Sequence, residues 1–239
     1  MYIPVGKNWM HIGEGCPIMD ILYEDKYIIA VNKPAGLATQ TKRLGEKDLY
    51  SEVKNYLKGG YVGIINRLDQ PVSGVVLMAK SKQAAAKLES QIADKSIKKH
   101  YRAEVYDGSG ILKTGDEKTL NDYIITNPKE NLSCCVEADS QKSMSASGAK
   151  KASLEYRVIH KDDDNSVATL DILLHTGRHH QIRCQLEHAG LPILGDRRYG
   201  CTESISKATD LGIKNLKLTA YSYEFIHPIT GKVTNINIG

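Results

Sequence analysis

The sequence predicts an α+β fold, and two observations support this prediction. Short apolar runs with the two-residue alternation of strands recur along the chain, separated by turn-forming residues. Only a few segments show the spacing of apolar residues that is typical of helices. No internal repeat and no linker-like stretch divides the 239 residues, so we expect one domain over residues 21–239 after an irregular N-terminal arm at residues 1–20.

The expected elements follow in order along the chain. Strands are predicted over residues 21–32 (two, joined by a turn), 62–65, 74–79, 101–106, 152–160, 166–175, 217–226 and 231–238. Helices are predicted over residues 46–58, after an N-cap at Ser81 with an apolar face of Ala84, Ala85, Leu88 and Ile92, and around Ile182, Leu186 and Ala189. Residues 107–150 are polar and weakly periodic, so loops and short strands are expected there.

Composition describes an ordinary globular protein, with 41% apolar and 25% charged residues. The 32 basic and 28 acidic residues leave a net charge of +4, which permits a nucleic-acid partner without requiring one. Residues 80–102 carry seven basic residues against two acidic ones, a local net charge of +5. Charge alone favours a solvated helix face here, and a phosphate-contacting edge is the alternative.

The cysteines and the N-terminus point to the cytoplasm. Residues 1–20 lack the apolar core of a signal peptide, and no run approaches the length of a membrane helix. The five cysteines are odd in number and have no C-x-x-C spacing, so we expect free thiols in a reducing compartment. Adjacent Cys134 and Cys135 are expected to have no chemical role.

One stiff loop stands out as a candidate site. The strands at residues 62–65 and 74–79 flank a break that contains Pro71 and Gly74, and Asp69 lies at its mouth two positions after Arg67. Catalytic groups are often presented on such loops. A lone aspartate beside an arginine is more often a structural ion pair, so the loop by itself is a weak signal.

Two histidines and a cysteine within residues 180–188 have a spacing that metal sites use. His180, Cys184 and His188 have the i, i+4, i+8 spacing of one helix face, but no matching fourth ligand is evident, so no metal site is expected. G-x-S-x-G, Walker and Rossmann motifs are absent, which leaves a serine hydrolase, an NTPase and a dehydrogenase without support.

Five blocks of sequence, in order, resemble the RluA family of RNA pseudouridine synthases. They are N-K-P-A-G at residues 32–36, N-R-L-D with V-S-G-V at 66–75, K-H-Y-R-A at 99–103, G-R-H-H-Q-I-R with G-L-P-I-L-G-D and Y-G at 177–200, and F with H-P at 225–228. The resemblance implies that family's fold, a mixed, largely antiparallel central sheet flanked by helices, with a central catalytic cleft. The agreement with the family begins at about residue 21, so only about 20 residues precede it and the small S4 RNA-binding domain of many relatives is not expected.

The resemblance also assigns roles to single residues. Asp69 matches the catalytic aspartate, Tyr101 the active-site tyrosine, and Arg183 the arginine that pairs with the aspartate. Arg67 matches the residue that helps to displace the target nucleotide, and Leu218 matches an apolar residue near the uracil. Further contacts with RNA are expected from Lys33, Lys99, Arg178 and His180. The sequence departs from the family pattern at Asn66, Val72, Gln185 and Thr219, which leaves the shape of the nucleotide pocket open.

The resemblance implies an isomerase that converts uridine to pseudouridine in structured rRNA or tRNA. Because the reaction needs neither a redox step nor phosphate energy, no nucleotide cofactor is expected, and we expect a cytoplasmic monomer without membrane contact. One carboxylate could attack the base, attack the sugar or act as a base. The alternatives are a non-catalytic RNA-binding protein or RNA chaperone on the same fold and, more weakly, a glycosyl hydrolase, which lacks a second placed acid.

Overall fold

The computed structural model describes residues 19–43, 45–136 and 148–238. Nearly all of the expected N-terminal arm lies outside these residues. The described residues form two compact units, the first with residues up to Ile97 and from Tyr221 onward, the second with Lys98–Ala220. Whether they work as one catalytic domain stays a prediction.

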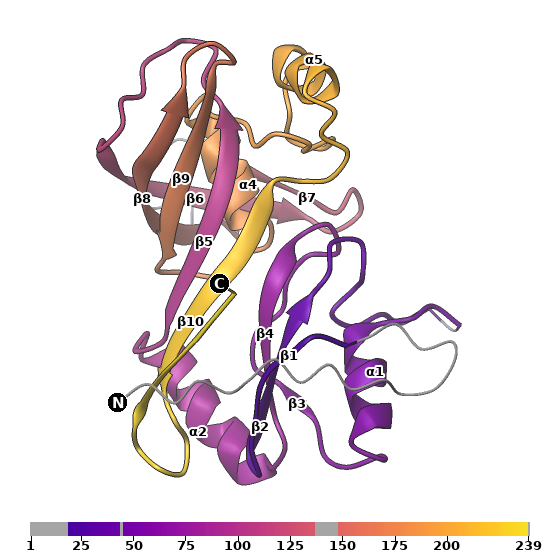
Figure 1. Cartoon of the computed structure of the whole chain (residues 1–239). Coiled ribbons are helices and arrows are strands. Elements are labelled where there is room, and N and C mark those ends of the chain that lie inside the picture. Colours follow the sequence, from indigo (N-terminus) through magenta and orange to yellow (C-terminus); the bar gives the residue numbers. More distant parts are fainter. Residues whose placement is uncertain (1–18, 44, 137–147, 239) are drawn as a thin grey trace. The chain divides into compact units, whose positions relative to one another are not determined.

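The first unit is built on a β-sheet. Its strands are β1 (Ile21–Glu24), β2 (Ile28–Lys33), β3 (Gly63–Ile64), β4 (Ser73–Ala79), β10 (Leu218–Ile226, from Tyr221 onward) and β11 (Val233–Asn237). The order is β1-β2-β4-β10, with β3 paired to β4 and β11 paired to β10 (Figure 1). The β3–β4 pairing confirms the predicted hairpin, in which Ile64 lies opposite Met78. The Asp69 loop therefore leaves the sheet between two hydrogen-bonded strands.

Two helices of the first unit begin at side-chain caps, of which the cap at Ser81 was predicted. Asp48 accepts the Ser51 backbone N–H at the start of α1 (Leu49–Tyr56), and Ser81 accepts the Ala84 N–H at the start of α2 (Lys82–Ala93). Ala84, Ala85 and Leu88 are buried in the core with β2 and β4, as predicted. The inclusion of Ile92 was wrong, because its side chain is 38% exposed at the last turn of α2.

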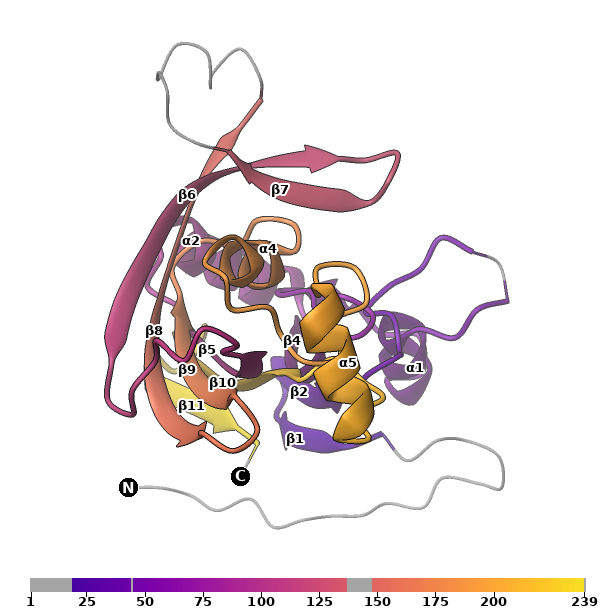
Figure 2. The ribbon, with the colours of Figure 1, turned by 90° about the horizontal axis from the view of Figure 1, so that it is seen from above.

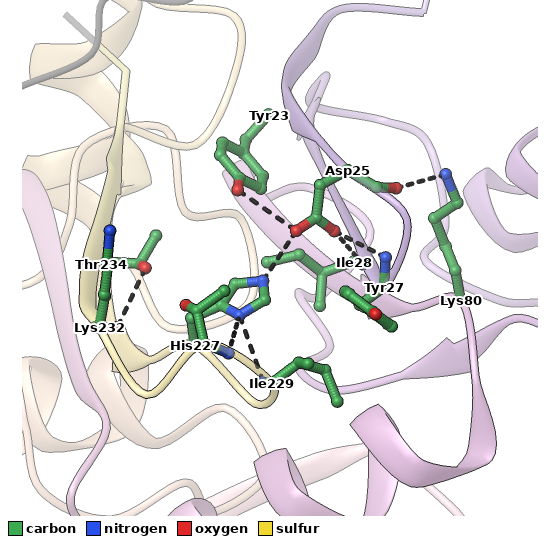
Figure 3. A network of polar contacts seen from close by, with 10 residues as sticks. Tyr23, Asp25, Tyr27, Ile28, Lys80, His227, Ile229, Lys232 and Thr234 are labelled. Atoms are coloured by element: carbon green, nitrogen blue, oxygen red, sulfur yellow. Dashed lines mark hydrogen bonds and ion pairs between the residues drawn. The ribbon is translucent and has the colours of Figure 1, made fainter.

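The C-terminal strands of the first unit are tied to its first hairpin by His227. Its Nδ1 accepts the backbone N–H groups of Ile229 and Thr230, so Nε2 carries the proton and donates to Asp25 at 2.8 Å (Figure 3). Burial acts to raise the pKa of Asp25, but backbone N–H groups and His227 outweigh it and hold the pKa below its ordinary value. The H-P motif near the C-terminus thus has a structural role.

The second unit is a curved antiparallel sheet. It contains β5 (Lys98–Tyr106), β6 (Glu117–Asn127), β7 (Leu132–Val136), β8 (Lys150–Asp162) and β9 (Val167–Leu174), in the order β5-β9-β8-β6-β7. The predicted alternation in β9 is confirmed, with Ala168, Leu170, Ile172 and Leu174 buried. Helix α4 (Gln181–His188) lies inside the curve of β6, β7 and β8 (Figure 2). Helix α5 (Thr202–Asp210) completes the unit.

Two parts of this unit differ from the prediction. Residues 117–127, expected to be loops and short strands, form the eleven-residue strand β6, whose buried residues include only the apolar Leu120 and Ile124. Helix α5 was not predicted, because its buried residues are Ser204 and Ala208 and its isoleucine, Ile205, is exposed. Neither element has a regular apolar pattern in its sequence. The side chains that it buries are small, as in α5, or widely spaced, as in β6. None of the helices in the described ranges is long and apolar enough to cross a membrane.

Candidate active site

Asp69 sits in a loop that neighbouring backbone groups hold in place. The Thr39 hydroxyl accepts the Leu68 N–H at 3.1 Å and donates to the Leu68 carbonyl at 2.8 Å. The Gln70 carbonyl accepts the Gly36 N–H at 2.8 Å, and the Asp69 carbonyl accepts the Val72 N–H at 3.0 Å. Both chain neighbours of Asp69 are therefore fastened to residues 36–39, which supports the prediction of a stiff loop that presents a half-buried carboxylate.

The base of this loop is closed by Asn66, a residue at which the sequence departs from the family pattern. The Asn66 amide donates to the Val75 carbonyl at 2.9 Å and accepts the Leu77 N–H at 2.7 Å. Gly74 follows the loop with φ +124°, a backbone conformation that favours glycine. Asn66 therefore serves to close the hairpin, and Arg67 beside it has an exposed side chain.

Lys33 lies fully buried at the end of β2 in the same unit. Its Nζ donates to the carbonyl oxygens of Pro34, Leu37 and Gln70 at 3.0, 2.7 and 3.2 Å. Burial lowers the pKa of Lys33 to about 8, and the negative charge of Asp69 partly offsets this effect. The burial favours a role in supporting the Asp69 loop, while the direct RNA contact assigned to Lys33 stays a prediction.

Arg183, on α4 of the second unit, forms a buried bidentate ion pair. Its Nε and Nη2 donate to the two carboxylate oxygens of Asp196 at 2.7 and 2.8 Å, and its side chain is 4% exposed. The guanidinium also lies 4.8 Å from the centre of the Tyr199 ring. Burial acts to raise the pKa of Asp196, but Arg183 and the N–H groups of Arg198 and Tyr199 hold it below its ordinary value.

The residues just before α4 form a second polar network. His180 is the N-cap, with φ +52° in the left-handed region, and its Nδ1 lies 2.9 Å from the Tyr199 hydroxyl. Gln181 accepts the Thr176 hydroxyl and the Arg178 N–H, so it links the end of β9 to the helix. His180 is only 7% exposed, which favours a positioning role, and its predicted contact with RNA remains untested.

Basic side chains border an open groove of about 400 Å³ in the second unit. Its lining includes Lys150, Arg178 and His179. Arg178 is exposed and donates from Nε to the Lys151 carbonyl, and a Cβ added at Gly177 would lie 3.8 Å from the Lys99 Nζ. Burial lowers the pKa of Lys99. The structure therefore places Lys99 and the Gly177–Arg178 segment near one another, as an RNA-contacting surface would require.

Tyr101 and Leu218 are the remaining predicted site residues in this unit. Tyr101, on β5 opposite Ile172, is 8% exposed, and Leu218, at the start of β10, is 3% exposed. Burial suits side chains that contact a base through their apolar surfaces. Asp69, Arg67 and Lys33 belong to the first unit, and the pairing of Asp69 with Arg183 stays a prediction.

His180, Cys184 and His188, which share one helix-face spacing in the sequence, have three different partners in the structure. His180 points to Tyr199, whereas Cys184 lies 3.3 Å from the Cys135 sulfur and His188 lies 3.1 Å from Asp122. Among the described residues, the candidate group of metal ligands is Asp122, Cys135 and His188.

Sequence reasoning missed Asp196 as a partner of Arg183. Asp196 follows Gly195, which has φ +76° and at which a Cβ would overlap the Asn215 carbonyl. The G-D pair inside the most specific motif block was the signal that could have identified it, because an aspartate beside a required glycine marks a fixed backbone. Gln185, another departure from the family pattern, is fully buried and donates to Asp122 at 2.6 Å.

The fold and these residues define an α+β protein with an anchored carboxylate and a separate group of basic side chains. The family model described as RNA pseudouridylate synthase matches residues 27–188. The chain therefore belongs to the RNA pseudouridylate synthase family, which confirms the resemblance drawn from its motifs.

Relatives and solved structures agree with this assignment. The chain is 32% identical to the tRNA pseudouridine synthase C of Pasteurella multocida, over 92% of this chain and 91% of that protein. It is 31% identical to the ribosomal large subunit pseudouridine synthase C of Buchnera aphidicola, over 91% of this chain and 66% of that protein, so it spans about two thirds of this relative. The structure of human RNA pseudouridylate synthase domain containing 1 matches with a TM-score of 0.73 and 18% identity, over 96% of this chain and 86% of that one. This likeness confirms the predicted α+β fold class.

Proposed function

We propose that this protein is an RNA pseudouridine synthase that isomerises a uridine in structured rRNA or tRNA, with Asp69 as the catalytic carboxylate. The observation that carries the proposal is the anchoring of the Asp69 loop through Leu68 and Gln70, in a chain whose family membership is established. An anchored loop holds a reacting carboxylate in one position relative to a bound base, which lowers the entropic cost of reaction.

The reaction needs only groups that the chain supplies. The bond from C1′ to N1 of uracil breaks, the base turns, and a bond forms from C1′ to C5. The C5 proton leaves and N1 takes up a proton, so atoms and electrons balance without an external reagent. The carboxylate of Asp69 acts on the base or on the sugar, or as a base towards the ribose. Tyr101 stacks on the uracil and Leu218 packs near it, while Arg183 pairs with Asp69.

Base flipping gives a role to the basic residues. Taking a base out of its stack costs a few kcal/mol, and an exposed Arg67 inserted in its place offsets part of that cost. Lys99 and Arg178 contact phosphates beside the groove of the second unit. Lys80, in contrast, forms an ion pair in which its Nζ lies 2.6 Å from Glu24 Oε1. This residue of the basic stretch 80–102 therefore has a partner within the protein.

Pseudouridine mapping of total RNA with and without the gene tests the proposal and identifies the uridine. The purified protein must then form pseudouridine at that position in a transcript, and Asp69→Asn should lower the rate by about 10³-fold or more while RNA affinity stays within a few-fold. A protein that binds RNA but leaves every uridine unchanged would support the RNA-chaperone alternative. Full activity of Asp69→Asn would remove the assignment of the carboxylate.

A further inference from the structure

Four metal-ligating side chains come from neighbouring elements of the second unit. They are Asp122 on β6, Cys135 on β7, and Cys184 and His188 on α4, here called the Cys–His–Asp cluster. Ligand atoms of Asp122, Cys135 and His188 all lie within 4.8 Å of one another. The Cys184 sulfur lies 3.3 Å from that of Cys135. Cys184 therefore adjoins this group of three through Cys135.

Strand register brings Asp122 and Cys135 to one face of the sheet. Ile124 pairs with Cys135 across β6 and β7, so these two side chains point to the same face. Asp122, two residues before Ile124, shares that face because strand side chains alternate with a period of two. Asp122 and Cys135 are therefore diagonal neighbours on the face that packs against α4.

Helix α4 supplies the other two side chains from one of its faces. Cys184 and His188 are four residues apart, a spacing that places side chains one above the other on a helix. Cys184 is buried with Ile124 and Tyr199 in an apolar cluster against which Cys135 packs. His188 is 44% exposed, which leaves a path for an ion from solvent. Three elements thus converge on the cluster.

Two of the separations among these ligand atoms are close to those around a zinc ion. Two nitrogen or oxygen ligands at ~2.1 Å from a tetrahedral Zn²⁺ lie ~3.4 Å apart, and two thiolates at ~2.3 Å lie ~3.8 Å apart. The His188 Nδ1 to Asp122 Oδ1 distance is 3.1 Å, and the sulfur–sulfur distance is 3.3 Å. Torsional adjustments of these side chains would bring both distances to the tetrahedral values.

An outer hydrogen bond already orients one of the ligands. Gln185 donates from Nε2 to Asp122 Oδ2 at 2.6 Å, while His188 contacts the other oxygen, Oδ1. Metal-ligating carboxylates are commonly held by such partners. The amide of Gln185 is itself fixed by Gln181, whose Nε2 donates to Gln185 Oε1 at 2.9 Å.

We propose that the Cys–His–Asp cluster binds one Zn²⁺ ion through Asp122, Cys135, Cys184 and His188. Thiolates and imidazole favour zinc over magnesium or calcium, which take oxygen ligands. Binding transfers the two thiol protons to solvent and changes no oxidation state. The ion fastens the β6–β7 hairpin to α4, the helix that carries Arg183, so its role is structural. The proposal does not depend on the proposed function.

Metal binding by the full chain tests the proposal directly. The protein, purified with a reductant and stripped of metal, should bind one equivalent of Zn²⁺ in competition with a chromophoric chelator. Co²⁺ in its place should give the visible absorption of a tetrahedral site and the near-ultraviolet bands of cobalt–thiolate bonds. Zn²⁺ should also raise the midpoint of thermal unfolding in proportion to its occupancy.

Matched variants locate the site. Cys135→Ser and His188→Ala should each weaken Zn²⁺ binding by more than ~10–100-fold. That range is typical of the loss of a residue that only hydrogen-bonds to a metal ligand. Cys134→Ser, which alters the exposed neighbouring thiol, should leave affinity and the cobalt spectrum unchanged. His188→Ala alters an exposed side chain, so it keeps the test valid if Cys135→Ser does not fold.

Three outcomes would overturn the proposal. The first is the absence of a tetrahedral cobalt spectrum in the folded protein, and the second is equal affinity of the Cys134→Ser and Cys135→Ser variants. The third is a Cys135–Cys184 disulfide that persists with reductant, found by thiol counting and mass spectrometry.

Discussion

The two units bury cations in opposite ways. In the first unit, the Lys33 ammonium donates to backbone carbonyl oxygens, and the charge of Asp69 acts on it only through space. In the second, the Arg183 guanidinium donates to both oxygens of the buried Asp196. Neutral carbonyl oxygens offset only part of the cost of burying the ammonium charge, so the pKa of Lys33 falls. In the second unit, the carboxylate of Asp196 stabilises the charged guanidinium, and the guanidinium lowers the pKa of Asp196 in return.

The difference indicates how each unit holds its predicted catalytic residue. The Asp69 loop depends on neutral hydrogen bonds, of which those from Thr39 are typical, and such bonds contribute about 1 kcal/mol each. Arg183 depends on an ion pair that is costly to break, because either partner alone would be a buried charge. We therefore expect the Asp69 loop to keep its structure when one hydrogen bond is removed. We expect the loss of either Arg183 or Asp196 to destabilise the second unit strongly.

The largest expected effect follows from removing the arginine. Arg183→Ala should lower the free energy of unfolding by about 3–5 kcal/mol, because Asp196 stays buried without its partner, and it should cripple turnover. Urea unfolding and pseudouridine formation measure the two effects. Because the pKa of Asp196 is depressed, its stabilising contribution is present above its unfolded-state pKa and is lost as the pH falls through the folded-state value.

A double substitution separates stability from catalysis. Arg183→Met with Asp196→Leu should recover much of the lost stability but none of the lost turnover. Arg178→Ala, which alters an exposed arginine before the same helix, should change stability by less than about 0.5 kcal/mol. Near-normal turnover of Arg183→Ala would instead make Arg183 a purely structural residue.

Lys33 should give the next largest effect, and its pH dependence should appear at basic rather than acidic pH. Its folded-state pKa of about 8 lies below the ordinary 10.5, so the unfolded chain binds more protons between these values. The free energy of unfolding of the wild type should therefore rise relative to Lys33→Met as the pH increases from about 8 to 10, by on the order of 2–3 kcal/mol. Parallel denaturation curves at each pH measure this difference. A constant difference across this range would contradict the lowered pKa.

Loss of one loop anchor should have a smaller effect. Thr39→Val removes the hydroxyl that bonds both backbone groups of Leu68, so stability should fall by about 1–2 kcal/mol and turnover several-fold. Thr39→Ser keeps the hydroxyl and should retain most of both. Equal turnover of the valine and serine variants would show that the Asp69 loop does not need this anchor.

The smallest effect is expected at the basic groove. Arg178→Ala should weaken RNA binding a few-fold and reduce the slope of log affinity against log salt by about 0.7–1, with no change in stability. Arg43→Ala removes another exposed arginine, which pairs with Glu46 at 3.0 Å, and serves as the control. Equal salt slopes for the two variants would remove Arg178 from the RNA-contacting surface.

Local patterns predicted the elements whose apolar residues follow a clear period. The alternation at residues 166–175 and the cap at Ser81 are examples, and the ordered motif blocks led to the family. The same reasoning failed at β6 and α5, since apolar residues there are sparse or exposed. The same holds for the candidate site. Motifs indicated Asp69 and Arg183, but not Thr39 and Asp196, the residues that hold them in place.

The sequence by itself determined the α+β class, most strand and helix positions and the family, because these depend on residues close in the chain or on motifs in a fixed order. Only the tertiary structure decided that Thr39 anchors Leu68, that Asp196 pairs with Arg183, and that Cys135 lies against Cys184. These contacts join residues many positions apart. Chain folding creates such proximity, and no local period of hydrophobicity records it.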